Sequence, residues 1–224
     1  MNVCHIITRL IVGGAQENTL LSCEGLHQRG HRVHLIIGPD AGPEGSLLEQ
    51  ARAGGYTVHT ARHLRRAVRP IEDLRARREL RRLIEWIRPD VVHTHSSKAG
   101  ILGRLAAHDA GVPVIIHTIH GMSFNRTQPR LIRVLYRALE RHCARYTDDF
   151  ISVADAMTRQ MLAAGIGSPH QYTTVHSGMR TDWFDPARHD RAAVRAKWGF
   201  DDSVVVAGSI ARLFRNKGYE QLIP

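Results

Sequence analysis

Short runs of β-branched and aliphatic residues alternate along the chain with longer stretches in which apolar residues recur every three or four positions. The short runs predict strands, and the longer stretches predict helices. Eight strands are expected, at residues 3–8, 32–37, 56–60, 91–94, 114–118, 150–153, 172–176 and 204–207. Helices are expected between them, near residues 15–29, 45–53, 71–88, 98–110, 127–147, 155–164 and 187–197.

Strands and helices that alternate this regularly predict an α/β protein with a Rossmann-like parallel sheet and helices on both of its faces. We assign residues 1–176 to this N-terminal domain and residues 177–202 to an interdomain linker and helix, because the linker is rich in turn formers. Residues 203–224 then read as the start of a second α/β domain. A single strand with part of a helix cannot bury its own apolar face. We therefore expect either a truncated domain or a segment that packs on the first domain or on a partner.

The composition is that of a globular protein, with 43% hydrophobic and 23% charged residues, which excludes wholesale disorder. No apolar run approaches the roughly 20 residues that a membrane-spanning helix needs. The N-terminus lacks the pattern of a secretory signal. The three cysteines, Cys4, Cys23 and Cys143, are too few and too scattered for a disulfide framework or a zinc site. We therefore expect a cytoplasmic protein with reduced thiols.

The net charge of +10, from 31 basic and 21 acidic residues, favours a partner of negative charge. Only three of the basic residues are lysines, so a coding bias toward arginine is an alternative explanation. Arginines concentrate in residues 62–88 and along one side of the helix at residues 127–147, whose other side is expected to be apolar through Leu131, Leu135 and Leu139. These two arginine-rich segments are expected either to contact an anionic membrane surface, as in a peripheral membrane protein, or to be solvated helix surfaces without a partner. A nucleic-acid partner is not expected, because the basic residues lack aromatic interleaving.

The candidate chemistry follows the carboxyl ends of the expected strands, where open parallel sheets bind their ligands. Gly13 and Gly14 follow the first strand and lead into a helix together with Gln16. Paired glycines permit the close approach of a ligand and unusual dihedral angles, and a helix N-terminus offers free N–H groups. The pair belongs neither to a dinucleotide fingerprint nor to a Walker loop, so an ordinary tight turn is the alternative.

Polar residues also follow the fourth strand, in the order His95, Ser96, Ser97 and Lys98. Ser96 or Ser97 is expected to cap the next helix. Lys98 falls in the first turn of that helix, where a cation opposes the helix dipole. This conflict suggests that Lys98 meets an anion such as a phosphate, and an exposed lysine without a partner is the alternative.

His120 follows the fifth strand, with a glycine directly behind it, and is well placed for polar contact or proton transfer. Together with His93, His95 and His117 it makes four histidines at two neighbouring strand ends. We expect no metal there, because no acidic or cysteine ligand accompanies these histidines.

The last motif combines two cations near the beginning of a helix. Arg212 lies in the loop after the last expected strand, and Lys217 and Gly218 begin the helix that follows. Two fixed cations at such a place suit a diphosphate, and they would stabilise a departing nucleoside diphosphate. A solvated basic turn is the alternative.

In their order and spacing these motifs resemble those of glycosyltransferase family 4, whose members are retaining enzymes of the GT-B fold. Residues 177–184 also resemble the interdomain linker of that family. The resemblance covers the whole chain. The segments that carry it are Gly13-Gly14-Ala-Gln16, residues 91–100 around His95, residues 117–121 around His120, and residues 208–218 with Arg212 and Lys217.

The resemblance implies that the N-terminal domain binds a lipid-linked or polysaccharide acceptor. We assign the acceptor-binding role to Gly13, Gly14, Gln16, His95, Ser97 and Lys98, of which the resemblance itself indicates the glycine loop. The resemblance implies that His120 contacts the transferred sugar as the catalytic residue, that Arg212 and Lys217 bind the diphosphate of a UDP- or GDP-sugar co-substrate, and that transfer needs no metal or other cofactor. The family's second domain also supplies a glutamate pair and a nucleotide pocket, which do not occur before Pro224, so we expect the 224-residue chain alone to be inactive.

Two other functions stay open on the sequence. A sugar-nucleotide epimerase of the same architecture would use similar strand-end histidines and diphosphate-binding cations, and it would release an epimer without an acceptor. A non-catalytic binding module would bind an acceptor or a partner, and its binding would not change in the variant Lys217→Ala.

Overall fold

The computed structural model describes residues 1–39, 42–125, 127–211 and 218–222. The chain divides into two compact units, Met1–Met179 and Arg180–Pro224. The described residues of the first unit contain a sheet of seven parallel strands. The strands are β1 (Asn2–Ile7), β2 (Arg32–Ile37), β3 (Thr57–Thr60), β4 (Val91–His95), β5 (Val114–Ile119), β6 (Asp149–Ser152) and β7 (Tyr172–Thr174). The helices of this unit are α1 (Gly14–Gln28), α2 (Leu48–Ala53), α3 (Pro70–Ile87), α4 (Ser97–Asp109), α5 (Arg130–Ala144), α6 (Asp155–Ala163) and the short η1 (Pro169–Gln171).

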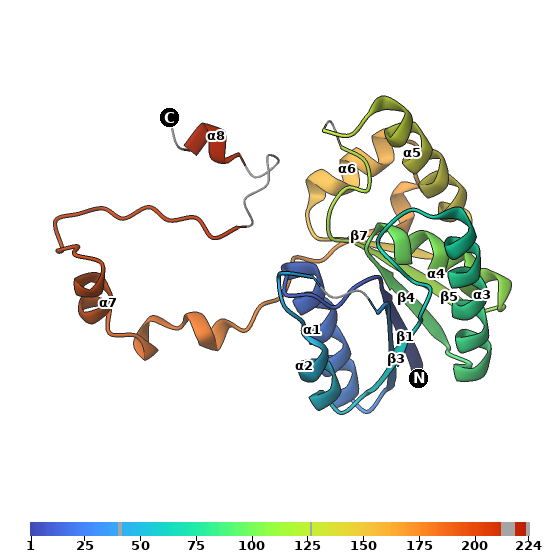
Figure 1. Cartoon of the computed structure of the whole chain (residues 1–224), viewed down its shortest axis with the longest axis horizontal. Helices are drawn as coiled ribbons and strands as arrows, with labels where there is room; N and C mark the ends of the chain where they lie inside the picture. Colours follow the sequence, from blue (N-terminus) through green and yellow to red (C-terminus); the bar gives the residue numbers. More distant parts are fainter. Residues whose placement is uncertain (40–41, 126, 212–217, 223–224) are drawn as a thin grey trace. The chain divides into compact units, whose positions relative to one another are not determined.

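The strands lie in the order β3-β2-β1-β4-β5-β6-β7 (Figure 1). The chain moves outward from β1 through β2 to β3, and then crosses back through α3 to place β4 beside β1. The direction of winding therefore reverses between β1 and β4. In open α/β sheets, ligands bind beyond the carboxyl ends of the strands at such a point, so the topology places the ends of β1, β4 and β5 where a ligand is expected.

Helices cover both faces of the sheet, which confirms the predicted α/β architecture. On one face, α1 and α2 pack on Ile7, Leu35 and Ile37 of the first two strands. On the other face, α3 and α4 pack on Ile6 and Val92. Figure 1 shows the first pair of helices to the left of the sheet and the second pair to its right. The two cores arise because successive side chains of a strand point to opposite faces.

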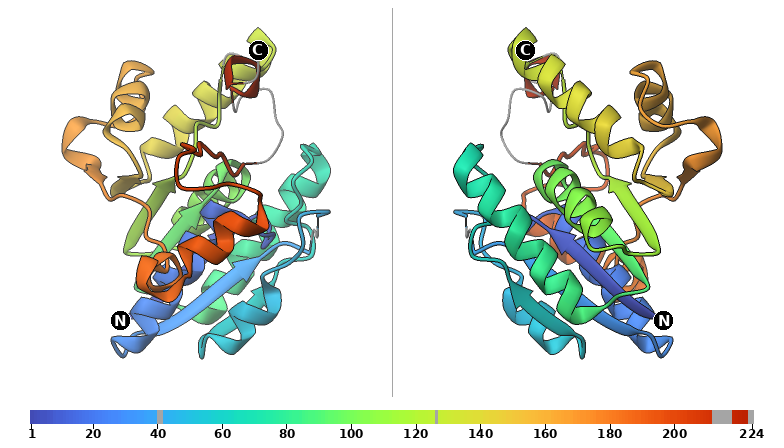
Figure 2. Two further views of the ribbon diagram at one scale, coloured as in Figure 1. Left: turned by 90° about the vertical axis from the view of Figure 1, so that its left-hand side faces the viewer. Right: turned by 90° about the vertical axis from the view of Figure 1, so that its right-hand side faces the viewer.

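Helices α5 and α6 complete the unit near its β7 edge, far from α2 beside β3 (Figure 2). α6 packs on β6 and β7, and α5 packs on α4. The apolar side predicted for α5 is largely exposed, since Leu131 is 78% exposed and Leu135 is 48% exposed. The buried residues of α5 are Glu140, Cys143 and Ala144, all in its C-terminal half. Only that half therefore packs on the unit, and the N-terminal half presents apolar residues to solvent.

The second unit contains short helical segments in its described residues. These are η2 (Thr181–Phe184), η3 (Pro186–Arg188), α7 (Arg191–Lys197) and α8 (Tyr219–Leu222). The strand predicted at residues 204–207 is wrong, because these residues form no strand. Val205 is 95% exposed, and a strand needs a neighbour to pair its backbone N–H and C=O groups. Within the described part of the chain, no helix is long and apolar enough to cross a membrane.

Candidate functional site

The glycine loop connects β1 to α1 at the carboxyl edge of the sheet. Gly13 has an extended backbone (φ 167°, ψ 154°), so the unusual dihedral angles expected there are not found. The backbone N–H groups of Gln16 and Glu17 both donate to the Gly13 carbonyl, at 3.0 Å each. A Cβ placed on Gly14 would meet no atom within 4 Å. Packing within the described chain therefore does not require a glycine at position 14, and the space beside it is open.

The junction between β4 and α4 is tied to the end of β1. The hydroxyls of Thr8 and Ser96 lie 2.8 Å apart, and the backbone N–H of Ala99 donates to the Thr8 hydroxyl at 3.0 Å. Ser96 occupies the predicted N-cap position of α4, but its side chain makes no hydrogen bond to the helix backbone, and Thr8 satisfies a first-turn N–H instead. Ser97 is the first residue of α4 and is partly buried. The contact fixes the start of α4 against β1.

Lys98 faces a carboxylate of the same unit. Its Nζ lies 2.5 Å from Oδ1 of Asp73 on α3, and it also donates to the carbonyl of Ala67. The side chain is 12% exposed. The anion near Lys98 in this structure is therefore Asp73, and a role of Lys98 in acceptor binding stays a prediction that would require this ion pair to rearrange.

Three histidines join in one hydrogen-bonded series, which we call the histidine chain: His5 within β1, His95 at the end of β4 and His120 directly after β5. Nδ1 of His5 lies 3.0 Å from Nε2 of His95, and Nδ1 of His95 lies 3.0 Å from Nε2 of His120. His5 and His95 are buried, and His120 is partly buried. The predicted residues His95 and His120 thus lie in direct contact. His5 was missed, because it lies within a strand that reads as core, and only its register beside His93 reveals it.

Burial controls the charge of these histidines. It lowers the pKa of His5 and of His120 to about 4. The pKa values of His93 and His95 are lowered well below their usual range, first by burial and then by the neighbouring histidines. These four histidines are therefore neutral at neutral pH, because removing an imidazolium from water is unfavourable.

Coordination of a metal ion is the alternative to hydrogen bonding among these histidines. His5, His93 and His95 can each offer a nitrogen, and these atoms lie within 4.8 Å of one another. Both nitrogens of His95, however, already face nitrogens of His5 and His120 at hydrogen-bond distance. Nε2 of His93 is also engaged, at 2.6 Å from the Thr118 hydroxyl. The described contacts therefore fit hydrogen bonding between imidazoles better than metal coordination.

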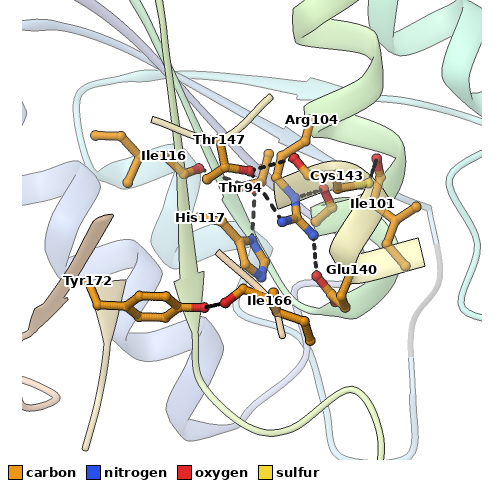
Figure 3. Close-up of polar contacts among 11 residues, drawn as sticks. Thr94, Ile101, Arg104, Ile116, His117, Glu140, Cys143, Thr147, Ile166 and Tyr172 are labelled. Atoms are coloured by element: carbon orange, nitrogen blue, oxygen red, sulfur yellow. Dashed lines mark hydrogen bonds and ion pairs between the residues drawn. The ribbon is translucent and has the colours of Figure 1, made fainter. Parts of the chain in front are cut away.

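A second polar network lies on the α4 side of the sheet (Figure 3). His5 and His95 alternate along their strands with Ile6 and Thr94 and therefore point to the opposite face. We call it the Arg104 network: Arg104, Glu140 and Thr147. Arg104 donates through Nη2 to Glu140 at 2.5 Å, through Nε to the Gly100 carbonyl at 2.7 Å and through Nη1 to the Thr147 hydroxyl at 3.4 Å. Arg104 and Glu140 are 0% and 1% exposed. The network joins α4 to α5 behind β5.

A cavity of about 680 Å³ lies between α5, α6 and the loop after β5. Its lining combines apolar side chains, among them Phe124 and Val134, with Arg130, Arg133 and Arg137. Arg137 stacks over the Phe124 ring, and its buried Nε has no hydrogen-bond partner in the described residues. The sequence located these arginines on a helix side but did not predict a cavity. Such a lining suits a ligand with an anionic group and an apolar part.

Gln16 lies in the first turn of α1, where its Oε1 would be 3.0 Å from a Cβ on Gly13. Arg212 and Lys217 lie outside the described residues.

The fold and the strand-end residues define a Rossmann-like α/β domain with a polar site at its switch point. Residues 13–178 match the family described as glycosyl transferase 4-like domain, and the chain belongs to this family. It is similar to UDP-Gal:alpha-D-GlcNAc-diphosphoundecaprenol alpha-1,3-galactosyltransferase of Escherichia coli, with 29% identity over 187 residues that cover 84% of this chain and 47% of that protein. The chain spans about half the length of the curated relatives it matches.

Solved structures show the same fold. A glycosyltransferase of Rickettsia africae matches with a TM-score of 0.66 at 17% identity, over 91% of this chain and 50% of that one. UDP-GlcNAc 2-epimerase of Neisseria meningitidis, bound to UDP-GlcNAc, matches with a TM-score of 0.56 at 15% identity, over 78% of this chain and 46% of that one. At these identities the similarity concerns the fold alone.

Proposed function

We propose that the chain supplies the acceptor-binding part of a glycosyltransferase. The enzyme transfers a sugar from a nucleoside diphosphate sugar, with UDP or GDP as the leaving group, to a lipid-linked or polysaccharide acceptor. The anomeric configuration is retained, and no metal ion takes part. One observation carries the proposal: the glycine loop, His95 and His120 follow three neighbouring strands at the switch point of a glycosyl transferase 4-like domain.

Each residue of the site has a defined part in this reaction. The bond between the anomeric carbon and the diphosphate breaks, the acceptor hydroxyl oxygen forms the new bond to that carbon, and the hydroxyl proton passes to the departing diphosphate oxygen. His120 is neutral at neutral pH, because burial lowers its pKa to about 4, so it acts as a hydrogen-bonding group on the sugar and not as a fixed cation. Negative charge grows on the departing diphosphate, and Arg212 and Lys217 are proposed to stabilise it.

The acceptor is proposed to bind along the carboxyl edge, from the open space beside Gly14 to the cavity at α5. The relative from E. coli acts on an acceptor named as a diphosphoundecaprenol, which joins a diphosphate to a long apolar chain. The α5 cavity offers a matching lining, because Arg130, Arg133 and Arg137 surround an apolar wall. Arginine binds phosphate oxygens with paired N–H donors.

Peripheral contact with the inner face of the cell membrane is proposed at the N-terminal half of α5. Leu131, Val134 and Leu135 are exposed there beside arginines, and this combination binds anionic bilayer surfaces. Helix α3 supports the same role less well, because several of its arginines are already paired with carboxylates. These pairs are Arg75 with Glu72, Arg77 with Asp109, and Arg81 with Glu85.

Binding of a polyprenyl-diphosphate-linked N-acetylglucosamine in detergent micelles, measured by titration calorimetry, tests the acceptor proposal. We expect Arg133→Ser to weaken binding by about tenfold, because one charge-assisted hydrogen bond is lost. Arg52→Ser is the matched control, since Arg52 is an exposed arginine of α2. Equal affinity of the wild-type and Arg133→Ser chains, or no binding by either, contradicts the proposed acceptor site.

Product analysis separates sugar transfer from epimerisation. With labelled UDP- and GDP-sugars, a glycosyltransferase forms a new glycosidic bond only when the acceptor is present, and a chelator leaves the rate unchanged. The anomeric configuration of the product is read by nuclear magnetic resonance. An epimer or free sugar formed without acceptor contradicts the proposal.

A further inference from the structure

The histidine chain has a geometry that couples its members. Ring centres of His5 and His95 lie 5.3 Å apart, as do those of His95 and His120. The facing nitrogens are 3.0 Å apart in both contacts, so each pair of nitrogens lies close to the line between the ring centres. These are well-aligned imidazole–imidazole hydrogen bonds, and in each one a single nitrogen carries the proton.

The neighbouring residues hold the rings in place. The ring of His93 packs 4.3 Å from that of His95 and 4.9 Å from that of His5, measured between ring centres. His93 is itself held by the 2.6 Å contact with the Thr118 hydroxyl. Rotation of His95 away from the histidine chain would therefore disturb two packed rings on adjacent strands.

The two ends of the histidine chain differ. At the inner end, Nε2 of His5 is buried and has no hydrogen-bond partner in the described residues. At the outer end, Nδ1 of His120 has no hydrogen-bond partner among the described residues, and the side chain is only partly buried at the carboxyl edge of β5. The inner end is closed to ligands, whereas the outer end faces the proposed sugar site.

The burial of Nε2 of His5 determines which imidazole nitrogens of the histidine chain carry a proton. A buried N–H without an acceptor is rarer and less favourable than a buried nitrogen lone pair without a donor. Nε2 of His5 is therefore the bare nitrogen, and His5 donates from Nδ1 to Nε2 of His95. His95 must then donate from its own Nδ1 to Nε2 of His120, because a neutral imidazole carries one proton.

We propose that His5 and His95 are positioning residues that hold His120 in the tautomer with its proton on Nδ1, so that His120 presents a hydrogen-bond donor to a substrate oxygen. This inference rests on the proposed function for the identity of that oxygen, which belongs to the sugar. Neutral imidazoles throughout the histidine chain agree with it, since a neutral ring carries one proton and the direction of each hydrogen bond then fixes the direction of the next. His120 is then a donor of fixed direction and does not accept a proton from the acceptor hydroxyl.

Nitrogen-15 nuclear magnetic resonance of the 224-residue chain, labelled at histidine, tests the proposal without any activity measurement. Protonated and bare imidazole nitrogens have well-separated shifts. At pH 7.5 we expect His120 to show a protonated Nδ1 and a bare Nε2, and His5 to show the same pattern. A wild-type spectrum in which His120 carries its proton on Nε2 overturns the proposal.

Variants of His5 test the coupling. His5→Phe keeps a ring but removes the donor to His95, so the Nδ1–H to Nε2–H ratio of His120 should fall by about tenfold, the factor that one hydrogen bond supports. His5→Asn places an amide N–H near the position of Nδ1 and should restore the ratio. A His120 ratio that is the same in His5→Phe and in the wild type overturns the coupling.

His34 supplies the matched control. Nδ1 of His34 lies 3.0 Å from Nε2 of His59, with ring centres 5.3 Å apart, in the same arrangement on β2 and β3. His34→Phe should leave the His120 spectrum unchanged. If the tautomer is as proposed but the chain does not bind the acceptor in the calorimetric titration, the proposed function fails and the positioning inference stands; the reverse outcome retains the function and removes the inference.

Discussion

The two polar networks lie on opposite faces of one sheet, and they differ in how they end. In the Arg104 network, the guanidinium reaches Glu140, Thr147 and the Gly100 carbonyl, and all of these lie inside the unit. The histidine chain begins at a buried nitrogen without a partner and ends at the partly buried His120. The first network is closed on the protein, and the second is open toward the carboxyl edge.

The charge of the two networks differs as well. Arg104 and Glu140 form a buried ion pair, and each charge depends on the other because neither has water around it. The histidine chain is neutral, because burial lowers the pKa values of its members. An ion pair whose groups all bond within the protein is suited to joining helices. The neutral histidine chain instead leaves a nitrogen of His120 available to hydrogen-bond a ligand. We infer that the first network serves stability and the second serves the site.

Removing one member of the ion pair should have the largest effect. Arg104→Met leaves the Glu140 carboxylate buried without its cation, so we expect the free energy of unfolding to fall by about 3–5 kcal/mol. Urea denaturation followed by circular dichroism measures the change.

Two further variants sharpen that result. The double variant Arg104→Met/Glu140→Leu removes both charges and should recover most of the loss. Arg81→Met removes a member of the exposed pair with Glu85 and should cost at most about 1 kcal/mol. A loss in Arg104→Met no greater than that in Arg81→Met would show that the network does not join the helices.

Acid should lower the free energy of unfolding, because the histidines of the histidine chain are held neutral in the folded protein. The pKa of His5 is about 4 in the folded chain, below the ordinary histidine pKa of about 6.5 that applies in the unfolded chain, so the unfolded chain takes up the proton first as the pH falls. The contribution of His5 is complete above pH 6.5 and is lost between pH 6.5 and 4, with a loss of about 2 kcal/mol at pH 5. Urea denaturation at pH 7.5 and at pH 5 measures it.

The variant His5→Phe provides the internal comparison for the acid effect. It lacks the titrating group, so its stability should fall less than that of the wild type between the two pH values. An identical pH dependence of the two chains would mean that His5 takes up its proton in the folded state as easily as in the unfolded one.

The fold was predictable from the sequence because hydrophobic periodicity is local. All seven strands of the sheet were predicted to within a few residues. The strand expected at residues 204–207 has the right residue types, but strand formation depends on a neighbour that periodicity does not report. The apolar spacing of Leu131 and Leu135 likewise indicates a helix, but it does not tell which half of that helix finds a packing partner.

The sequence could predict which site residues lie at strand ends, but it could not predict the side-chain contacts between strands. His95 and His120 follow strands and could be located, whereas His5 pairs with His95 across 90 residues of sequence. That contact depends on strand order and register, which no local pattern contains. Lys98 illustrates the same limit: its place in the first turn indicated an anion, and only the packing of α3 on α4 shows that Asp73 is the anion present.

The smallest effect on stability is expected at the open end of the histidine chain. His120→Ala leaves Nδ1 of His95 without its acceptor, but water can enter from the carboxyl edge, so the free energy of unfolding should fall by no more than about 1 kcal/mol. His117→Ala is the matched comparison, because His117 lies on β5, the strand that directly precedes His120, with its ring on the Arg104 side. There it contacts the Thr94 hydroxyl at 2.9 Å and packs closely on Gly100. Its removal leaves a buried void and should cost about 2–3 kcal/mol. If urea denaturation gave the two variants equal losses, the outer end of the histidine chain would be part of the structural core, and its assignment to the site would lose its physical basis.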